Sequence, residues 1–244
     1  MKQTMAVVLL SIFLGCQKSG SGNNNNNNNN GLANQPTAQA TFDSQSGGVY
    51  KGSLTGSSGY FVVNLQATKP FIIYQWTTPS GNIDSLFTSS LGSWTSGQAI
   101  TKAVFTGSDG SVFWFSVGAN GSGASIDSVF IPGHTGPVYA AIGKELSTSQ
   151  IKIFQGTGTT SGAGCYNGIV NLWMNSTTGA YAYLGTSGDF GSGPLSVSGN
   201  TVTTGNGGNN SENGTLTISS DGMSISGTVS NKSCTHAISA TRIL

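Results

Sequence analysis

The chain has 244 residues, which is enough for one large or two small domains. Only 7% of the residues are charged, the formal net charge is +1, and glycine, serine and threonine together make up about 41% of the sequence. This composition excludes a basic nucleic-acid-binding surface, and it excludes a helical bundle rich in alanine, glutamate, lysine and leucine. Hydroxyl and amide groups, rather than charges, must therefore solvate the surface.

The first 16 residues have the pattern of an export signal. Lys2 supplies a short positive start, and an apolar run follows at residues 6–14. This run is far shorter than the roughly 20 residues that span a bilayer. It ends in Gly15-Cys16, which resembles the lipobox of bacterial lipoproteins, where a small residue precedes the cysteine that becomes lipidated. The resemblance implies removal of residues 1–15 and a lipid on Cys16; the alternative is an ordinary secretory signal with an incidental cysteine.

The lipobox resemblance also implies a location. In enteric lipoproteins an aspartate after the lipidated cysteine signals retention in the inner membrane, whereas this chain has Gln17. We therefore expect an exported protein anchored through its N-terminal lipid to the cell envelope, at the outer membrane. Removing residues 1–15 also removes Lys2, so the formal charge of the mature chain becomes zero.

Three cysteines are an awkward number for an exported protein. If Cys16 carries a lipid, Cys165 and Cys234 remain as a pair. An oxidising compartment favours a disulfide between them, with two buried free thiols as the alternative.

Residues 16–46 show no apolar periodicity, and they include eight consecutive asparagines at 23–30. Such a polar tract cannot bury enough surface to offset the entropy lost on ordering. The sequence therefore predicts a disordered tether between the lipid and the first folded residue.

From residue 47 onward, short apolar or alternating runs are separated by Gly, Ser, Asn and Asp, a pattern typical of antiparallel strands. The sequence predicts an all-β fold, an antiparallel sandwich or barrel. The Asp-Gly pairs at 109–110 and 221–222 each predict a hairpin turn. The expected strands are 48–54, 60–66, 71–76, 100–105, 111–117, 126–131, 138–142 and 150–154, then 165–173, 180–184, 200–204, 215–219, 223–229 and 235–243.

A Gly/Thr-rich stretch at 156–163 separates the two series and is interpreted as a linker. Each series opens with Gly-x-Tyr-x-Gly, at 48–52 and at 164–168. This indicates two tandem β units, 47–155 and 164–244, although one closed barrel or sandwich through both series is equally compatible with the pattern.

Motifs that carry chemistry are absent from the sequence: it has no nucleophile elbow, zinc-protease helix, P-loop or dinucleotide fingerprint. The two histidines, His134 and His236, do not form a ligand cluster with other residues, so we expect no metal and no cofactor. Catalytic residues are not assigned.

Aromatic residues are the remaining candidates for a ligand-binding site. Tyr181 and Tyr183 share one face of a strand, and Trp94 lies in a Gly/Ser-rich loop. These rings are candidates for a platform that stacks on sugar rings; the alternative is that they belong to the core.

The sequence thus favours a lipid-anchored envelope protein that acts as a non-enzymatic binding or adhesion module on a tether. Its expected partners are the membrane, through the lipid, and either a carbohydrate or an envelope protein, but not nucleic acid. A structural envelope component without a soluble ligand, or an unrecognised hydrolase, are the alternatives.

Overall fold

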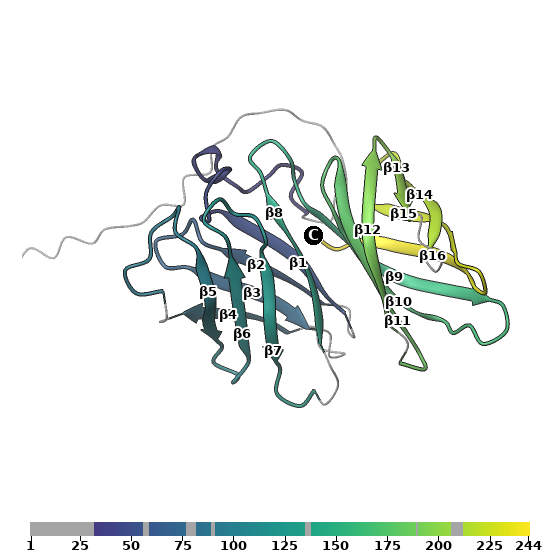
Figure 1. Cartoon of the computed structure of the whole chain (residues 1–244), viewed down its shortest axis with the longest axis horizontal. Helices are drawn as coiled ribbons and strands as arrows, with labels where there is room; N and C mark the ends of the chain where they lie inside the picture. Colours follow the sequence, from purple (N-terminus) through teal and green to yellow (C-terminus); the bar gives the residue numbers. More distant parts are fainter. Residues whose placement is uncertain are drawn as a thin grey trace, which may run out of the picture. The chain divides into compact units, whose positions relative to one another are not determined.

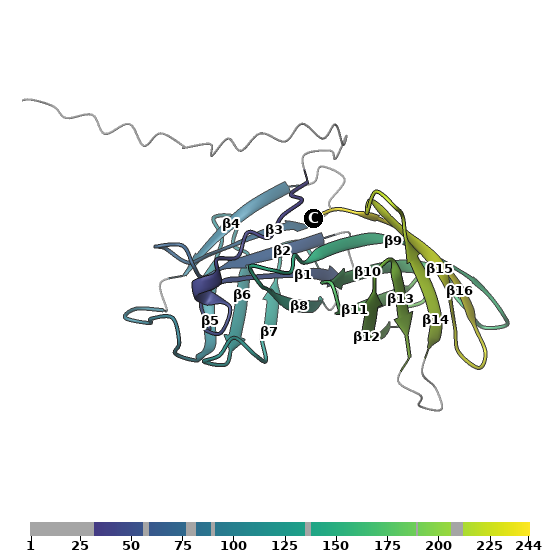
Figure 2. The same ribbon diagram turned by 90° about the horizontal axis from the view of Figure 1, so that it is seen from above.

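The structure, a computed structural model, describes residues 32–55, 59–76, 82–88, 91–134, 138–188, 190–205 and 212–244. The expected signal peptide, Cys16 and the asparagine run lie outside the described residues. The described chain is almost entirely β, with one short 3-10 helix, η1 (Ala40–Phe42) (Figures 1 and 2). The predicted all-β antiparallel fold is confirmed.

The first eight strands form one antiparallel sheet in the order β7-β6-β5-β4-β3-β2-β1-β8 (Figure 1). The strands are β1 (Val49–Thr55), β2 (Gly59–Asn64), β3 (Phe71–Trp76), β4 (Asn82–Thr88), β5 (Ile100–Thr106), β6 (Val112–Val117), β7 (Ser125–Phe130) and β8 (Tyr139–Glu145). Each strand follows its neighbour in sequence, except that β8 returns to pair with β1. Because β7 and β8, at the two ends of this order, also contact each other, the sheet curls round its core.

The next eight strands form a closed antiparallel barrel in the order β10-β11-β12-β13-β14-β15-β16-β9. The strands are β9 (Lys152–Ser161), β10 (Gly168–Met174), β11 (Thr178–Gly185), β12 (Phe190–Ser198), β13 (Thr201–Thr204), β14 (Asn213–Ile218), β15 (Ser224–Ser230) and β16 (Thr235–Arg242). Pairing of β16 with β9 closes the ring, which leaves no free sheet edge.

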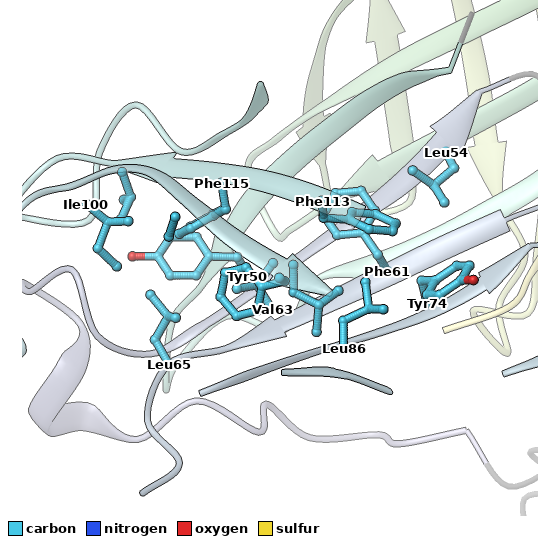
Figure 3. Close-up of a cluster of buried hydrophobic side chains, with 14 of the residues drawn as sticks. Tyr50, Leu54, Phe61, Val63, Leu65, Tyr74, Leu86, Ile100, Phe113 and Phe115 are labelled. Atoms are coloured by element: carbon cyan, nitrogen blue, oxygen red, sulfur yellow. The ribbon is translucent and has the colours of Figure 1, made fainter. Parts of the chain in front are cut away.

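Each sheet encloses a hydrophobic core of its own. In β2 and β3 every second residue is buried, so alternate side chains point into the first core. Phe61 and Phe115 are fully buried there, and the ring of Tyr50 packs edge-on against Phe115 with the centroids 5.4 Å apart (Figure 3). Leu172 and Leu216 belong to the second core, inside the barrel.

Both Asp-Gly pairs lie in hairpin turns, as predicted. Gly110 lies between β5 and β6 with φ +86°, and Gly222 lies between β14 and β15 with φ +71°. These are left-handed conformations that glycine adopts without steric cost. Strands β4 and β12 were not among the expected strands. β12 contains Pro194, which lies one residue outside the ladder that β12 forms with β13.

The prediction of a linker at 156–163 is wrong for most of this stretch, because residues 156–161 belong to β9. This strand pairs with β10 on one side and β16 on the other. A Cβ on Gly156 would collide with the main chain of Ser239 and Ala240, so this glycine permits close strand packing. The chain instead passes from the first sheet to the barrel between Glu145 and Lys152.

The expected tether also ends earlier than residue 46. Residues 32–46, which we call the strap, lie on the folded body although they have no apolar periodicity, because polar side chains of the body bind the strap's main chain. Lys144 donates hydrogen bonds to the carbonyl oxygens of Phe42, Asp43 and Gln45, at 2.7, 2.9 and 2.5 Å.

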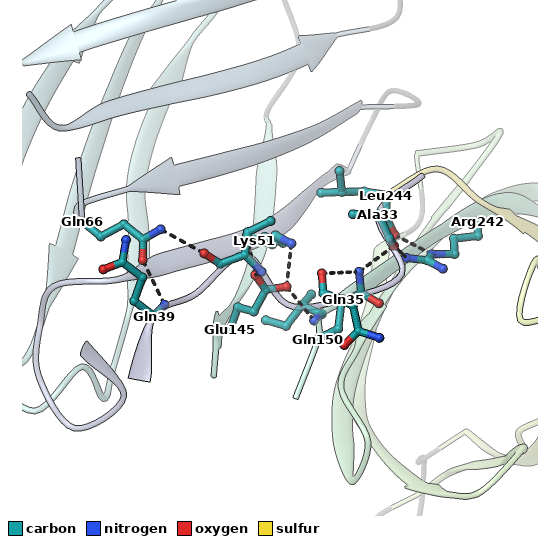
Figure 4. A network of polar contacts seen from close by, with 11 residues as sticks. Ala33, Gln35, Gln39, Lys51, Gln66, Glu145, Gln150, Arg242 and Leu244 are labelled. Carbon is teal, nitrogen blue, oxygen red and sulfur yellow. Dashed lines mark hydrogen bonds and ion pairs between the residues drawn. The ribbon is translucent and has the colours of Figure 1, made fainter. Parts of the chain in front are cut away.

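A buried carboxylate fixes the middle of the strap (Figure 4). Glu145 is fully buried and accepts hydrogen bonds from the main-chain N and the hydroxyl of Thr37, at 2.8 and 2.6 Å. Its other oxygen pairs with the ammonium of Lys51 at 2.5 Å and accepts the main-chain N–H of Ile151 at 3.1 Å. Burial raises the pKa of Glu145, but the hydrogen bonds from Lys51 and Thr37 and the charge of Lys51 outweigh burial and hold the pKa below its ordinary value.

The lowered pKa of Glu145 predicts a loss of stability in acid. The contribution of Glu145 is complete above the unfolded-state pKa and disappears as the pH falls through the folded-state value. Urea unfolding at about pH 6 and about pH 3 should therefore show a smaller acid loss in the Lys51→Met/Glu145→Leu double variant than in the wild type. The pKa values of Asp43 and Asp221 are also lowered, but both residues are present in the two proteins. Their contributions to the acid loss therefore cancel when the double variant is compared with the wild type.

The single variant Glu145→Leu is the control for this interpretation. It leaves the Lys51 ammonium buried without its carboxylate, which should cost about 3–5 kcal/mol at neutral pH, most of it recovered in the double variant. An equal acid loss in the wild type and the double variant would contradict the assignment.

Candidate functional site

The predicted cysteine pair comes together in the structure. Cys165 precedes β10 and Cys234 precedes β16, and their Sγ atoms lie at disulfide distance with the Cα atoms 5.8 Å apart. The bridge lies at the end of the barrel where β9 turns into β10 and β15 turns into β16. Cys16, the predicted lipidation site, lies outside the described residues.

Tyr181 and Tyr183 share a face, as expected, but this face is the interior of the barrel rather than an open sheet surface. Tyr183 is 7% exposed, its hydroxyl donates to the carbonyl oxygen of Tyr166, and its ring meets His236 edge-on at 5.1 Å. Burial, together with the charge of Glu212 and a hydrogen bond to it, raises the pKa of Tyr181.

Trp94 packs against the first core, whereas the two tyrosines belong to the second. It is half-buried against the core of the first sheet, and its indole N–H donates to the carbonyl oxygen of Gln98 at 3.0 Å. Trp94 and the two tyrosines therefore pack in different cores and do not form one platform.

The interior of the barrel is too full to hold a sugar. A cavity of about 10 Å³ lies among the tyrosines, His236 and Glu212, which is about the volume of one water. The imidazole Nε2 of His236 lies 3.7 Å from a carboxylate oxygen of Glu212. This cavity can hold a solvent molecule but not an organic ligand.

A larger hollow opens at the opposite end of the barrel from the disulfide. Its volume is about 550 Å³, within the range of small-molecule sites. It is formed by the β8–β9 connection and by the turns β10–β11, β12–β13 and β14–β15. We call it the barrel-end bowl, and it is lined by Thr148, Ser149, Gln150, Lys152, Met174, Asn175, Ser176, Val197, Gly199, Asn200, Ile218, Ser219, Ser220, Asp221 and Gly222.

Hydrogen bonds within the turns fix the rim of the barrel-end bowl. The side-chain oxygen of Asn175 accepts the main-chain N–H groups of Thr177 and Thr178, at 2.9 and 2.8 Å. Asp221 accepts the hydroxyl of Ser219 at 2.6 Å and the N–H of Met223 at 2.9 Å, and these bonds lower its pKa. Such turns present their remaining hydroxyl and amide groups in fixed positions.

One cation lines the barrel-end bowl, and a second lies close to it. Lys152, at the start of β9, lines it, and its Nζ lies 3.5 Å from the point that a Cβ on Gly222 would occupy. Burial lowers the pKa of Lys152, and the nearby charge of Arg242 lowers it further. Arg242 is buried, and its guanidinium donates to the carbonyl oxygens of Ala33 at 2.6 Å and Leu244 at 3.0 Å (Figure 4).

A smaller pocket of about 260 Å³ lies on the first sheet, at the ends of β3 and β7 and the β5–β6 turn. Trp76 and His134 meet edge-on there at 4.7 Å, and the hydroxyl of Tyr74 donates to Asp109 at 2.5 Å. Both Tyr74 and Trp76 are at least nine-tenths buried, so little of either ring is available to a ligand.

The sequence did not point to the barrel-end bowl, because its lining residues are those that favour turns in any β protein. The described residues contain no group of three or more His, Cys, Asp or Glu that could hold a metal ion. Among these same residues, no helix is long and apolar enough to cross a bilayer.

Comparison with known proteins assigns no function to the barrel-end bowl. No protein-family model, curated protein or solved structure matches this chain.

Proposed function

We propose that this chain is a lipid-anchored cell-envelope protein whose folded part is a non-enzymatic binding module, and that the barrel-end bowl binds a carbohydrate. The bowl is the observation that carries the proposal. It is a concave site of about 550 Å³ on a closed barrel, and hydroxyl and amide side chains line its rim.

The chemistry of the rim suits a sugar. Each serine hydroxyl donates one hydrogen bond and accepts others, and an asparagine amide does both, which matches the mixed donors and acceptors of sugar hydroxyls. Ser149, Ser176, Ser220 and Asn200 supply such groups from four different turns or connections. Met174 and Ile218, which belong to the barrel core, lie beneath the bowl, and little of either side chain is exposed.

The N-terminal residues support display at the envelope. Gly15-Cys16 resembles a lipobox, and the polar tract that follows is the tether that composition predicts. The lipid on Cys16 would place the protein in a membrane, at the outer membrane if Gln17 is read as in enteric lipoproteins. The tether would hold the barrel-end bowl within reach of envelope or external glycans.

Blocking the barrel-end bowl should abolish glycan binding. Ser220 is exposed on the rim, so Ser220→Trp should fill the bowl without disturbing the barrel. On a glycan panel we expect the mature protein to bind, the Ser220→Trp variant to lose at least about tenfold in affinity, and Ser226→Trp, on the exposed face of β15, to bind like the wild type.

Three results would overturn this function. Equal loss in both tryptophan variants would place binding elsewhere. No binding by the folded protein, with co-purification of envelope proteins, would favour a structural component. Release of sugar products from the panel would identify a hydrolase.

Lipidation is tested separately. In a bacterial host that processes lipoproteins, fed an alkyne-tagged fatty acid, we expect the wild type to be labelled and to sediment with membranes. Cys16→Ala should lose the label because the acceptor thiol is gone, and Gln17→Ala should keep it. Persistent labelling of the Cys16→Ala variant would contradict the assignment.

A further inference from the structure

The barrel-end bowl contains a cation whose charge no side chain in the described residues neutralises. Lys152 lines the bowl, and the two ion pairs found in the described residues, Lys51–Glu145 and His236–Glu212, do not include it. A lysine that is partly removed from water ordinarily gains a carboxylate partner or gives up its charge. The position of Lys152 therefore favours an anionic group on whatever occupies the bowl.

A second cation, Arg242, lies close enough to Lys152 for its charge to act on the lysine. Arg242 is 6% exposed, and its guanidinium makes its hydrogen bonds to the main-chain carbonyls of Ala33 and Leu244. Within the described residues, no side-chain carboxylate pairs with Arg242. Its repulsion is one cause of the lowered pKa of Lys152.

Of the described residues that line the barrel-end bowl, one carries a carboxylate, and it is already engaged. Asp221 accepts hydrogen bonds from Ser219 and Met223 in its own turn, and it lies beyond ion-pair distance of Lys152 among the described contacts. A carboxylate has about four acceptor positions, so Asp221 can still accept a ligand hydroxyl. The bowl thus offers one desolvated ammonium, one acceptor carboxylate and a rim of hydroxyl and amide groups.

We propose that the barrel-end bowl recognises an acidic sugar, such as a uronic acid, with Lys152 binding the sugar carboxylate and the serine and asparagine rim binding its hydroxyls. This inference rests on the proposed carbohydrate-binding function and names its ligand class. An inorganic anion would leave most of the 550 Å³ unfilled, and a neutral sugar would leave Lys152 without a counter-charge. A sugar that carries a carboxylate satisfies both features.

Two matched pairs of sugars test the proposal: glucuronate with glucose, and galacturonate with galactose, each pair differing in oxidation at one carbon. Affinities are measured by NMR titration of the folded mature protein at low salt. We expect a uronate to bind at least about tenfold more tightly than its neutral partner, and to weaken as salt rises, because a charge-assisted hydrogen bond is worth more than a neutral one. Shifted amides should map to Asn175, Asn200 and Ser220.

Substitution of the cation supplies the second test. Lys152→Met keeps the aliphatic stem, and it should weaken uronate binding about tenfold and bring the uronate and its neutral partner to similar affinities. Lys152→Arg keeps the charge and should bind within a few-fold of the wild type. Lys232→Met removes one charge from the β15–β16 turn, at the opposite end of the barrel, and should change nothing.

The outcomes separate this inference from the proposed function. Equal binding of neutral and acidic sugars in the barrel-end bowl would overturn the acidic-sugar assignment and leave the carbohydrate function standing. Binding of acetate or sulfate as tight as that of the uronates would show a simple anion site and would overturn the assignment too. Binding by neither sugar class, on these pairs and on the glycan panel, would overturn both.

Discussion

The fold depends on one buried carboxylate that joins three separate parts of the chain. Glu145, the last residue of β8, accepts hydrogen bonds from Lys51 in β1, from Thr37 in the strap and from Ile151 in the connection to β9. A buried charge without such partners would be strongly destabilising, so the burial of Glu145 requires all of these neighbours to be in place. The carboxylate of Glu145 therefore connects the first sheet, the strap and the segment that leads into the barrel.

The same connection shapes the candidate site. Gln150 and Lys152 flank Ile151, and both line the barrel-end bowl. The strap contributes on the other side, because the carbonyl oxygen of Ala33 accepts from both Gln150 and Arg242. The strap follows the predicted tether in sequence and precedes β1, so the segment next to the proposed tether also bonds Arg242. Main-chain hydrogen bonds of Ala33 thus connect the proposed ligand site with the strap.

Local patterns were enough to predict most of the strands and both Asp-Gly turns, because alternation and turn chemistry are local properties. The cysteine pair followed from the number of cysteines in the chain. Strand β12 was missed because Gly193 and Pro194 interrupt its alternation, and β9 was cut short because its glycines resemble a linker. Alternation correctly predicted that Tyr181 and Tyr183 share one face of their strand. It does not indicate which face becomes the interior when the sheet closes into a barrel. The strap and the barrel-end bowl depend on contacts between distant residues, such as Thr37 with Glu145, and no local pattern carries them.

Hydrogen exchange at the amide of Thr37 is the most direct measure of whether Glu145 fastens the strap. In the Glu145→Gln variant the charge that attracts this N–H and the Lys51 ammonium is gone. The account predicts that exchange at Thr37 accelerates at least about tenfold relative to the wild type, since a hydrogen bond to a charged group is lost, while the amide of Leu172 inside the barrel stays as protected as before. Unchanged protection at Thr37, or an equal loss of protection at Leu172, would contradict it.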